Sequence, residues 1–513
     1  MKFLLPLILL FFTTSHGQVK DLAELSSGKF LDSRIVYNDN QDDVYGYILL
    51  YENDRKSKAV YELEYVLLDK NLNRLTSGTF IQNRVSSFVK FVIEFSFVRK
   101  LENKLIIGLQ DVATIMGETS VINFRYRELD LNTFELSPQF TMKNLEKTTG
   151  NEISDGKVSY SDLPKFLPLL PIGSTNFIVM DQDKYMGHYE GTEMEERYAK
   201  KIHRFVVYDK NLKPIWDYNF NNKDIKGYEI FKYYDSDGED VILQRSRKKN
   251  FRTNPETNYE VFDLTSGKLK FSIKQIDKDY INSLQSIAFQ KDYLTVYSTV
   301  NRIENSKVFD NAQIIGLSKV TYNRLNGEKS SQNIFLFRDL ASKLEISEEG
   351  KIKSYGYLQF LNVRLAENGN TTAIAEGYSP SGNSSILDMF IFEFDSQMKL
   401  LYFKKVDKIK NLSNLPSWGE RLKFYGAFDF LYSQKLEGDN YAYFYTDNEK
   451  RSTRSPKWIL GVITQVDGQF NYEKIPMTTD NGQIYPVKAK NGYILLREET
   501  DRKSTLRLEK VNY

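Results

Sequence analysis

Cysteine and histidine, the residues most often used in metal centres and in nucleophilic catalysis, are almost missing from this chain. Its 513 residues include no cysteine and three histidines, of which His188 and His203 lie beyond the N-terminal segment. Disulfides, cysteine nucleophiles and thiolate metal sites are therefore excluded. Two histidines cannot build a histidine-rich metal centre and give little support to a Ser-His-Asp triad. We expect no metal site, no cofactor and no catalytic residue that the sequence can identify.

An acidic run from Asp235 to Asp240 has the composition of a calcium-binding loop. It lacks the ligand spacing of such loops and the bidentate glutamate that completes them. The run also falls where a turn between two strands is expected, so we interpret it as a turn. Glycoside chemistry needs only two carboxylates, and among 68 Asp and Glu residues the sequence singles out no pair.

Side chains suited to binding are better represented than side chains suited to catalysis. Basic residues that surround a phenylalanine could form a rim for an anionic glycan or an acidic partner, and exposed tryptophans or tyrosines could be stacking platforms or protein anchors. The alternatives are solvated charged loops and, for Trp418, packing over the edge of the fold. The candidate binding residues are Arg245, Arg247, Lys248, Lys249, Arg252, Tyr185, Tyr189, Trp418 and Trp458. The net charge of +2 gives no reason to expect binding to nucleic acid.

The scaffold that positions these candidate residues is indicated by a short pattern of two strands and a turn that recurs along the chain. In each copy an apolar or aromatic strand ends in Asp, a few polar residues follow, and a second short strand begins. The carboxylate of this Asp can accept a hydrogen bond from the backbone two residues later, which closes a turn. The Asn or Gly that follows tolerates the positive φ of a tight hairpin. A weaker copy has Asn323 in this place, and the turn aspartates of the other copies are Asp69, Asp130, Asp209, Asp263, Asp395 and Asp467.

Two more strand-like runs precede each hairpin, so each repeat contains four antiparallel strands, A to D. In the third repeat we expect strands A and B over 166–172 and 177–180, and in the seventh over 424–432 and 441–445. Four-stranded units repeated around an axis are typical of a β-propeller. The sequence therefore predicts an all-β protein, a single β-propeller with eight blades, or seven as the alternative. The last unit, 485–513, has room for three strands, and the segment between Gln18 and Phe30 could supply its outer strand.

The two faces of such a propeller are expected to differ. The A–B and C–D turns are short and form one face, which we call the short-turn face. The B–C and D–A connections carry the long insertions and form the other, the long-loop face, which is the predicted binding face because functional residues concentrate on loops. Charges on the inner A strands are rarely buried unless they are paired or face water. The candidate channel-lining residues, with structural ion pairs as the alternative, are Lys90, Glu94, Arg364 and Asp429.

The N-terminal segment predicts export. A basic start at Lys2, an apolar run over 3–12 and small residues up to Gly17 match a cleavable signal peptide, with the cut after Gly17. A retained anchor is the alternative, but the run is shorter than the roughly 20 residues that span a bilayer. We expect residues 1–17 to be removed, 18–513 to form the propeller without a transmembrane segment, and the protein to be secreted, periplasmic or on the cell surface of a bacterium.

These features together favour a secreted, non-enzymatic binding or scaffold propeller. It would recognise a protein or a polysaccharide, in the cell envelope or outside the cell, through its long-loop face. The alternative is a carbohydrate-active hydrolase or lyase with carboxylates at the mouth of the central channel.

Overall fold

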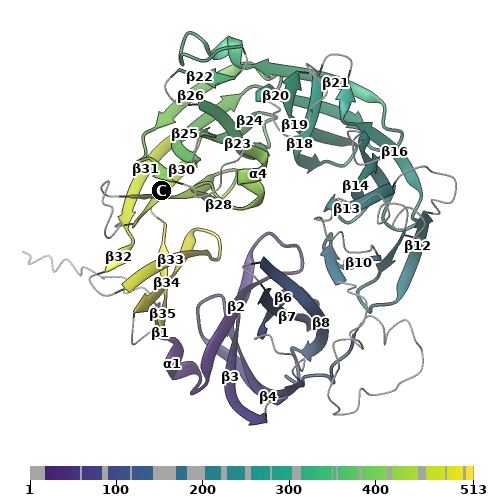
Figure 1. Cartoon of the computed structure of the whole chain (residues 1–513), viewed down its shortest axis with the longest axis vertical. Helices are drawn as coiled ribbons and strands as arrows, with labels where there is room; N and C mark the ends of the chain where they lie inside the picture. Colours follow the sequence, from purple (N-terminus) through teal and green to yellow (C-terminus); the bar gives the residue numbers. More distant parts are fainter. Residues whose placement is uncertain are drawn as a thin grey trace, which may run out of the picture.

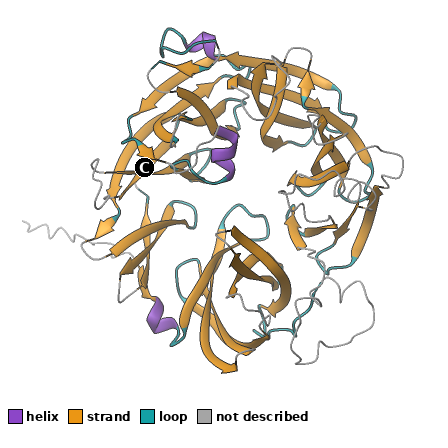
Figure 2. Cartoon of the chain, in the orientation of Figure 1, coloured by secondary structure: helices purple, strands orange, loops and turns teal. Residues whose placement is uncertain are grey.

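The structure of the protein is a computed structural model in which eight antiparallel sheets stand in a ring around a central axis, here called the channel (Figures 1 and 2). It describes residues 18–57, 60–83, 91–115, 118–141, 169–181, 203–220, 228–248, 256–277, 280–302, 314–348, 350–353, 356–380, 384–412, 419–448, 458–479, 482–500 and 504–511. The predicted eight-bladed propeller is therefore confirmed, and the alternative with seven blades is wrong. Among the described residues no helix has the length and apolar character needed to cross a membrane.

Each sheet is one blade, with the A strand next to the channel. Blade 1 contains β2 (Lys29–Tyr37), β3 (Val44–Ser57), β4 (Val60–Asp69) and β5 (Arg74–Asn83). Blade 2 contains β6 (Phe91–Leu101), β7 (Lys104–Ile115) and β8 (Glu118–Asp130), and bridges at Leu136 and Phe140 mark its outer edge. Blade 3 contains β9 (Leu169–Ile172), β10 (Asn176–Asp181), β11 (His203–Tyr208) and β12 (Pro214–Phe220). Blade 4 contains β13 (Tyr228–Ser236), β14 (Asp240–Lys248), β15 (Glu256–Asp263) and β16 (Leu269–Lys274).

The other four blades follow the same plan, with short additions. Blade 5 contains β17 (Ile276–Asp277), β18 (Tyr280–Phe289), β19 (Tyr293–Arg302), β20 (Ile314–Asn323) and β21 (Lys329–Leu336), followed by the 3-10 helix η2 (Phe337–Leu340). Blade 6 contains β22 (Lys351–Ile352), β23 (Gly356–Leu365), β24 (Thr371–Ser379), β25 (Ser385–Phe394), β26 (Leu400–Val406) and β27 (Asn411–Leu412). Helix α4 (Gly419–Phe424) precedes blade 7, which contains β28 (Phe430–Lys435), β29 (Tyr441–Asn448), β30 (Trp458–Val466) and β31 (Gln469–Pro476). Blade 8 contains β32 (Thr478–Thr479), β33 (Gly482–Lys488), β34 (Tyr493–Thr500) and β35 (Ser504–Lys510).

The ring is closed by the strand that begins at Gln18. This strand, β1 (Gln18–Asp21), pairs antiparallel with β35 as the outer strand of blade 8, in the register Gln18 to Leu508. Helix α1 (Leu22–Leu25) follows it, and Leu22 and Leu25 are buried in the core between blades 8 and 1. The closing strand predicted between Gln18 and Phe30 is thus confirmed.

Aromatic side chains fill the spaces between neighbouring blades. Between blades 5 and 6, Phe335, Phe337, Phe360 and Phe392 form one buried cluster. The rings of Phe337 and Phe360 stack at 5.9 Å, and those of Phe360 and Phe392 lie 5.7 Å apart. Large planar side chains suit this position because two flat sheets that meet at an angle leave a wedge that widens outward. The high content of Phe and Tyr therefore follows from the number of blade interfaces.

The predicted aspartate turns are confirmed in blades 1, 2, 3, 4 and 6, whereas in blade 7 Asp467 itself takes positive φ (50°). In the confirmed turns the residue with positive φ is often not the one expected. Asp69 Oδ1 accepts hydrogen bonds from the backbone N–H groups of Asn71 and Asn73, both at 2.8 Å. The left-handed residue of this turn is Leu72 (φ 65°), not the preceding Asn71, and Leu212 and Met398 take the same place in blades 3 and 6. This conformation is costly for a side chain with a Cβ. All three side chains are buried between blades, and we infer that their burial offsets the cost.

The connection between blades 6 and 7 differs from the sequence prediction. The segment 424–432, expected as one A strand, contains the end of α4, a turn, and the start of β28. Gly426 (φ 64°) ends the helix, because its N–H bonds to the Lys423 carbonyl while the Ala427 N–H bonds to the Leu422 carbonyl. This is the Schellman pattern of a helix C-terminus. The apolar run that resembled one strand therefore serves two elements.

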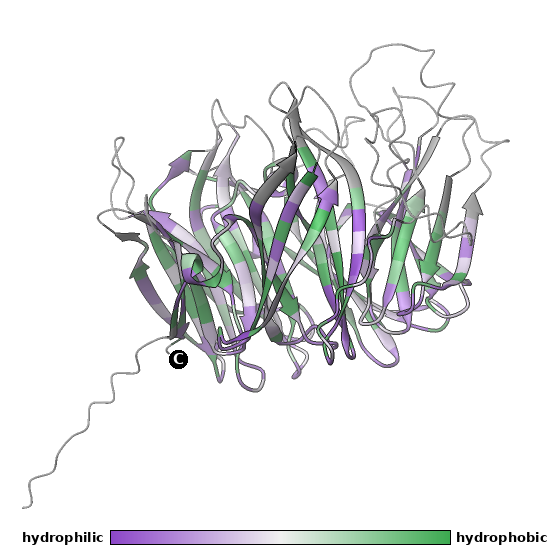
Figure 3. Ribbon diagram, turned by 90° about the horizontal axis from the view of Figure 1, so that it is seen from below, coloured by the Kyte–Doolittle hydropathy of each residue, from purple (hydrophilic) through white to green (hydrophobic). Residues whose placement is uncertain are grey.

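The short turns all lie on one face. Seen from the side, the A–B and C–D turns lie together along the lower edge of the ring in Figure 3. The ends of strands that lead into B–C and D–A connections point to the opposite face. The division into a short-turn face and a long-loop face therefore has a structural basis.

Candidate functional site

Helix α4 lies inside the ring, against the inner strand β23 (Figure 1). Because it belongs to the D–A connection between blades 6 and 7, it lies at the long-loop end of the channel. Leu422 anchors it, because this side chain is buried in a cluster with Tyr378, Ile386 and Phe428. The helix thus lies on the inner side of the ring, beside blades 5 and 6. Its polar side chains form hydrogen bonds with residues on the inner strands of blades 5 and 6.

A network of four polar side chains joins the helix to these strands. Glu420 Oε1 accepts hydrogen bonds from Gln285 Nε2 on β18 at 3.2 Å and from Gln359 Nε2 on β23 at 2.8 Å. Lys423 Nζ donates to Gln285 Oε1 at 2.5 Å and to the Phe360 carbonyl at 3.3 Å. The two amides hold a carboxylate and an ammonium group at defined positions, while Glu420 itself is exposed at the mouth. We call these four residues the mouth network.

The pKa shifts around this network favour neutral groups over charged ones. Burial lowers the pKa of Lys423, and the nearby Glu420 carboxylate opposes that shift. Burial also raises the pKa of Tyr234 and of Tyr378, and the charge of Glu420 adds to both shifts. Burial raises the pKa of Tyr259 to about 12. These phenols are therefore protonated hydrogen-bond donors at neutral pH and are poor general bases.

A second polar cluster lies below the long-loop face between blades 6 and 7. Lys408 Nζ lies 2.7 Å from Glu376 Oε2 and 2.7 Å from Asp429 Oδ2, and the side chains of Lys408 and Glu376 have no exposed area. Asn411 Nδ2 donates to Asp429 Oδ1 at 2.9 Å. Burial raises the pKa of Glu376 to about 7. This buried triad ties the start of β28 to blade 6.

Two further candidate channel-lining residues also lie in contacts between strands. Arg364 Nη1 donates to Asp439 Oδ1 in the A–B turn of blade 7 at 3.0 Å, and its guanidinium lies 3.7 Å from the centre of the Tyr441 ring. Glu94 Oε1 accepts from Gln110 Nε2 of the neighbouring strand at 2.7 Å. A charged residue on an A strand can therefore be held by a neighbouring strand or blade, as Glu94 and Arg364 are, and need not face the channel. A channel-lining role for these residues stays a prediction, and Lys90 lies outside the described residues.

The predicted binding residues are only partly described. Arg245 on β14 donates to Glu260 Oε1 at 2.7 Å and lies over the Phe231 ring at 5.5 Å. Arg247 and Lys248 follow on the same strand toward the long-loop face. Trp458 begins β30 and packs, half-buried, against the core between blades 7 and 8. Tyr185, Tyr189, Lys249, Arg252 and Trp418 lie outside the described residues, as does the predicted signal peptide 1–17.

Sequence reasoning missed the mouth network because it missed the helix. The sequence drew attention to this connection because of Trp418, yet the side chains that reach the inner strands are Glu420 and Lys423, two and five residues later. Their spacing of three residues places them on one side of a helix. The glycine at position 426 was an available signal for the helix end. Nothing in the local sequence indicates that Gln285 and Gln359 are their partners.

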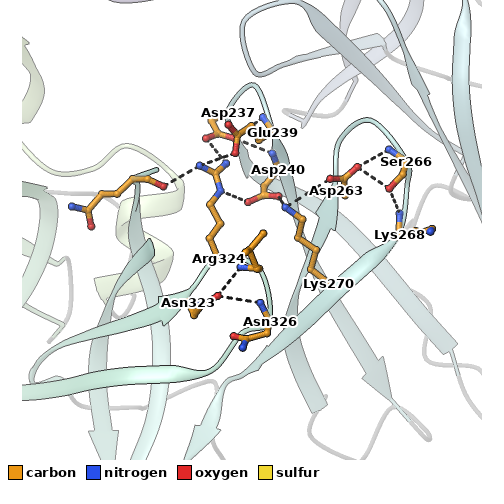
Figure 4. Close-up of polar contacts among 12 residues, drawn as sticks. Asp237, Glu239, Asp240, Asp263, Ser266, Lys268, Lys270, Asn323, Arg324 and Asn326 are labelled. Carbon is orange, nitrogen blue, oxygen red and sulfur yellow. Dashed lines mark hydrogen bonds and ion pairs between the residues drawn. The ribbon is translucent and has the colours of Figure 1, made fainter. Parts of the chain in front are cut away.

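The acidic run between β13 and β14 forms the A–B turn of blade 4, as predicted (Figure 4). Arg324, from the C–D turn of blade 5, donates to Asp237 Oδ2 at 2.5 Å and to Asp240 Oδ2 at 2.6 Å. Lys270 donates to Asp240 Oδ1 at 2.6 Å. The carboxylates of this turn are thus used in a clamp between blades 4 and 5. In the described part of the chain, no three His, Cys, Asp or Glu side chains are arranged to hold a metal ion.

Comparisons with known proteins leave the activity open. Residues 192–384 match a family of unknown function (DUF6770). A comparison with curated proteins gives no match.

Among solved structures, the chain is similar to the β-propeller domain of the Trilobed protease from Pyrococcus furiosus. The identity is 10%, the match covers 83% of this chain and 97% of that one, and the TM-score is 0.33. The acylaminoacyl peptidase of Pyrococcus horikoshii is 11% identical over 92% of this chain, with a TM-score of 0.35, and the match spans 57% of the peptidase. The polysaccharide lyase Uly1 is 10% identical, with 81% of this chain and 89% of the lyase covered and a TM-score of 0.39. Likenesses at these identities and scores carry no inference about function.

Proposed function

We propose that this protein is an exported, non-enzymatic binding propeller that recognises a polysaccharide at the channel mouth on its long-loop face. The observation that carries the proposal is the mouth network. Glu420 and Lys423 are held in place by two amides, and Glu420 is exposed at the mouth. Such groups can recognise a ligand without transferring its protons.

The chemistry of the mouth favours a polysaccharide over a protein. Sugar hydroxyl groups donate and accept hydrogen bonds, and the exposed Glu420 carboxylate and the part-exposed Gln285 amide can match them. Tyr425, at the end of α4, is exposed over 53% of its area and offers a ring for stacking against a sugar. Protein hot spots are instead enriched in desolvated aromatic and arginine anchors. The mouth therefore fits a polysaccharide better than a protein.

A carbohydrate-active hydrolase or lyase is the competing proposal. A hydrolase needs two carboxylates on either side of the scissile bond, and α4 presents Glu420 beside a lysine. A lyase that used one of the tyrosines as its base would need a lowered pKa, and those of Tyr234, Tyr259 and Tyr378 are raised. Both points favour binding over catalysis.

The test uses residues 18–513 and affinity electrophoresis against a panel of laminarin, xylan, dextran, dextran sulfate, alginate and polygalacturonate. We expect retardation by at least one of these polymers, without new reducing ends or unsaturated products. The double variant Glu420→Ala with Tyr425→Ala should bind that polymer at least ten-fold more weakly. The matched control is Leu325→Ser, because Leu325 is exposed over 80% of its area in a C–D turn on the short-turn face.

Three results would overturn the proposal. They are binding to none of the six polymers, equal binding by the double variant, and product formation that disappears in Glu420→Gln. The last result would support the enzyme. Each variant is first checked by its thermal unfolding transition, so that a misfolded mouth is not mistaken for a lost contact.

A further inference from the structure

A large open pocket lies at the long-loop end of blade 6, beside the mouth network. Its volume is about 910 Å³, near the upper end of the range of about 300 to 1,000 Å³ that is usual for ligand pockets. We call it the blade-6 pocket. The polar and aromatic residues that line it include Lys351, Tyr357, Asp388, Lys405, Asp407 and Lys410.

The lysines that line this pocket differ in whether an aspartate of the protein pairs with them. Lys405 Nζ lies 3.1 Å from Asp388 Oδ2 and 2.9 Å from Asp407 Oδ1, so this lysine is used by the protein. Lys351 and Lys410 are exposed, and within the described chain neither has a carboxylate at ion-pair distance. Among the described residues no carboxylate pairs with these two ammonium groups, which leaves them for a ligand.

The wall and floor of the pocket are fixed by the buried polar groups described above. Lys408 lines the pocket with its backbone, because its side chain points inward to Glu376 and Asp429. Its backbone N–H donates to Asp388 Oδ1 at 3.0 Å, which orients that carboxylate. The triad thus holds the floor in place. The lysine side chains that reach the pocket outnumber its aspartates by one.

The pocket and the mouth network share a wall of two tyrosines. Tyr357 lines the pocket, and its ring lies 6.0 Å from that of Tyr378. Tyr378 packs in turn against Leu422 of α4. Tyr357 and Tyr378 thus connect the blade-6 pocket to the helix that carries Glu420 and Lys423.

We propose that the blade-6 pocket binds an anionic sugar unit, carried by a carboxylate or a sulfate group, of the polysaccharide that the channel mouth recognises. The inference rests on the proposed function and names the chemical class of its ligand. Lys351 and Lys410 would bind the anionic group through charge-assisted hydrogen bonds. Asp388 and Asp407 would accept hydrogen bonds from sugar hydroxyls, and Tyr357 would pack against the ring.

The test compares ligands that differ only in charge. Oligogalacturonate is paired with its methyl ester, and dextran sulfate with dextran, in calorimetric titrations at 0.15 M salt. We expect the anionic member to bind at least ten-fold more tightly in one pair, and this preference to shrink as salt rises, since salt screens exposed charges. The double variant Lys351→Gln with Lys410→Gln should lose most of the preference and keep the affinity for the neutral member. The control Lys353→Gln, whose lysine pairs with Glu345 at 3.1 Å close to the pocket, should behave as wild type.

The outcomes separate this inference from the proposed function. Equal binding of charged and neutral members in both pairs would overturn the inference and leave the polysaccharide proposal standing. Preference for the anionic member that survives the double variant would place the anion site elsewhere and would also overturn it. If poly-glutamate binds as tightly as the best anionic glycan, the pocket recognises acidic peptides instead. Failure of all glycans, neutral ones included, would contradict the proposed function itself.

Discussion

Lys408 donates to Glu376 across 2.7 Å, and neither side chain has any contact with solvent. The ammonium group also serves Asp429, so two carboxylates share one cation. Glu376 accepts further hydrogen bonds from the backbone N–H groups of Asp429 at 3.3 Å and of Phe430 at 2.5 Å. This arrangement makes the junction of blades 6 and 7 sensitive to pH.

The first prediction follows from the pKa of Glu376, which burial raises from 4.5 to about 7. Between these values the folded protein keeps a proton that the unfolded chain has lost. The contribution of this group to the free energy of unfolding therefore falls as pH rises through that window. Replacing Glu376 by Gln removes the titration, so the variant should gain stability relative to wild type between pH 5 and pH 8.

Thermal unfolding at several pH values between 5 and 8 checks this prediction. The control is Glu345→Gln, because the Glu345 side chain is exposed over 71% of its area. A difference between Glu376→Gln and wild type that does not change with pH would contradict it.

The second prediction concerns the cation of the triad. Lys408→Met leaves two buried carboxylates without their ammonium partner, and breaking a buried ion pair in this way typically costs about 3–5 kcal/mol. We expect a loss of this size at pH 8 and a clearly smaller loss at pH 5, where Glu376 takes up a proton. Urea unfolding at the two pH values measures the difference. An equal loss of unfolding free energy at pH 5 and pH 8 would show that Lys408 does not stabilise the protein by pairing with the ionised carboxylates.

The third prediction concerns the clamp between blades 4 and 5. Arg324 contacts Asp240, whose side chain is fully buried, so Arg324→Ala should cost about 3–5 kcal/mol. Lys353→Ala breaks an ion pair whose side chains are 73% and 71% exposed, and such exposed pairs typically contribute about 0–1 kcal/mol. Denaturant unfolding of both variants gives the comparison. Similar costs for the two would mean that Arg324 does not clamp the blades.

The fourth prediction concerns ring closure. Leu22 is 2% exposed and packs between blades 8 and 1, whereas Val19 on the closing strand is 55% exposed. Leu22→Ala should destabilise the protein by about 2–5 kcal/mol, as is usual for a truncated core leucine. Val19→Ala should change little. Limited proteolysis should then cut Leu22→Ala faster at the N-terminal segment, and equal cutting rates would argue against a closing role for this segment.

The blades could be predicted from the sequence because the signals that define them are local. Asp69 and its equivalents form turns with residues two to four positions away, and alternating apolar residues mark the strands beside them. The positive φ of Leu72 could not be predicted, because burial between blades compensates for it. The apolar run that ends at Tyr432 hid the boundary between α4 and β28, since strands and short helices share such runs.

The candidate site was beyond local reasoning for a different reason. Glu420 meets Gln285 and Gln359 only because the ring brings three distant segments together. The blade-6 pocket likewise combines β22 with the end of β26. Sequence alone could indicate the long-loop face, but the partners on it depend on how neighbouring blades pack.

Hydrogen–deuterium exchange, with and without the polysaccharide that retards the protein in affinity electrophoresis, tests the central claim most directly. If the long-loop face binds the ligand, amides in 351–357 and 419–426 should exchange more slowly in the complex. The C–D turns at 70–73, 209–213 and 324–328 should not change. Protection confined to these turns, with none in α4 or at the blade-6 pocket, would place the ligand on the short-turn face and contradict the account.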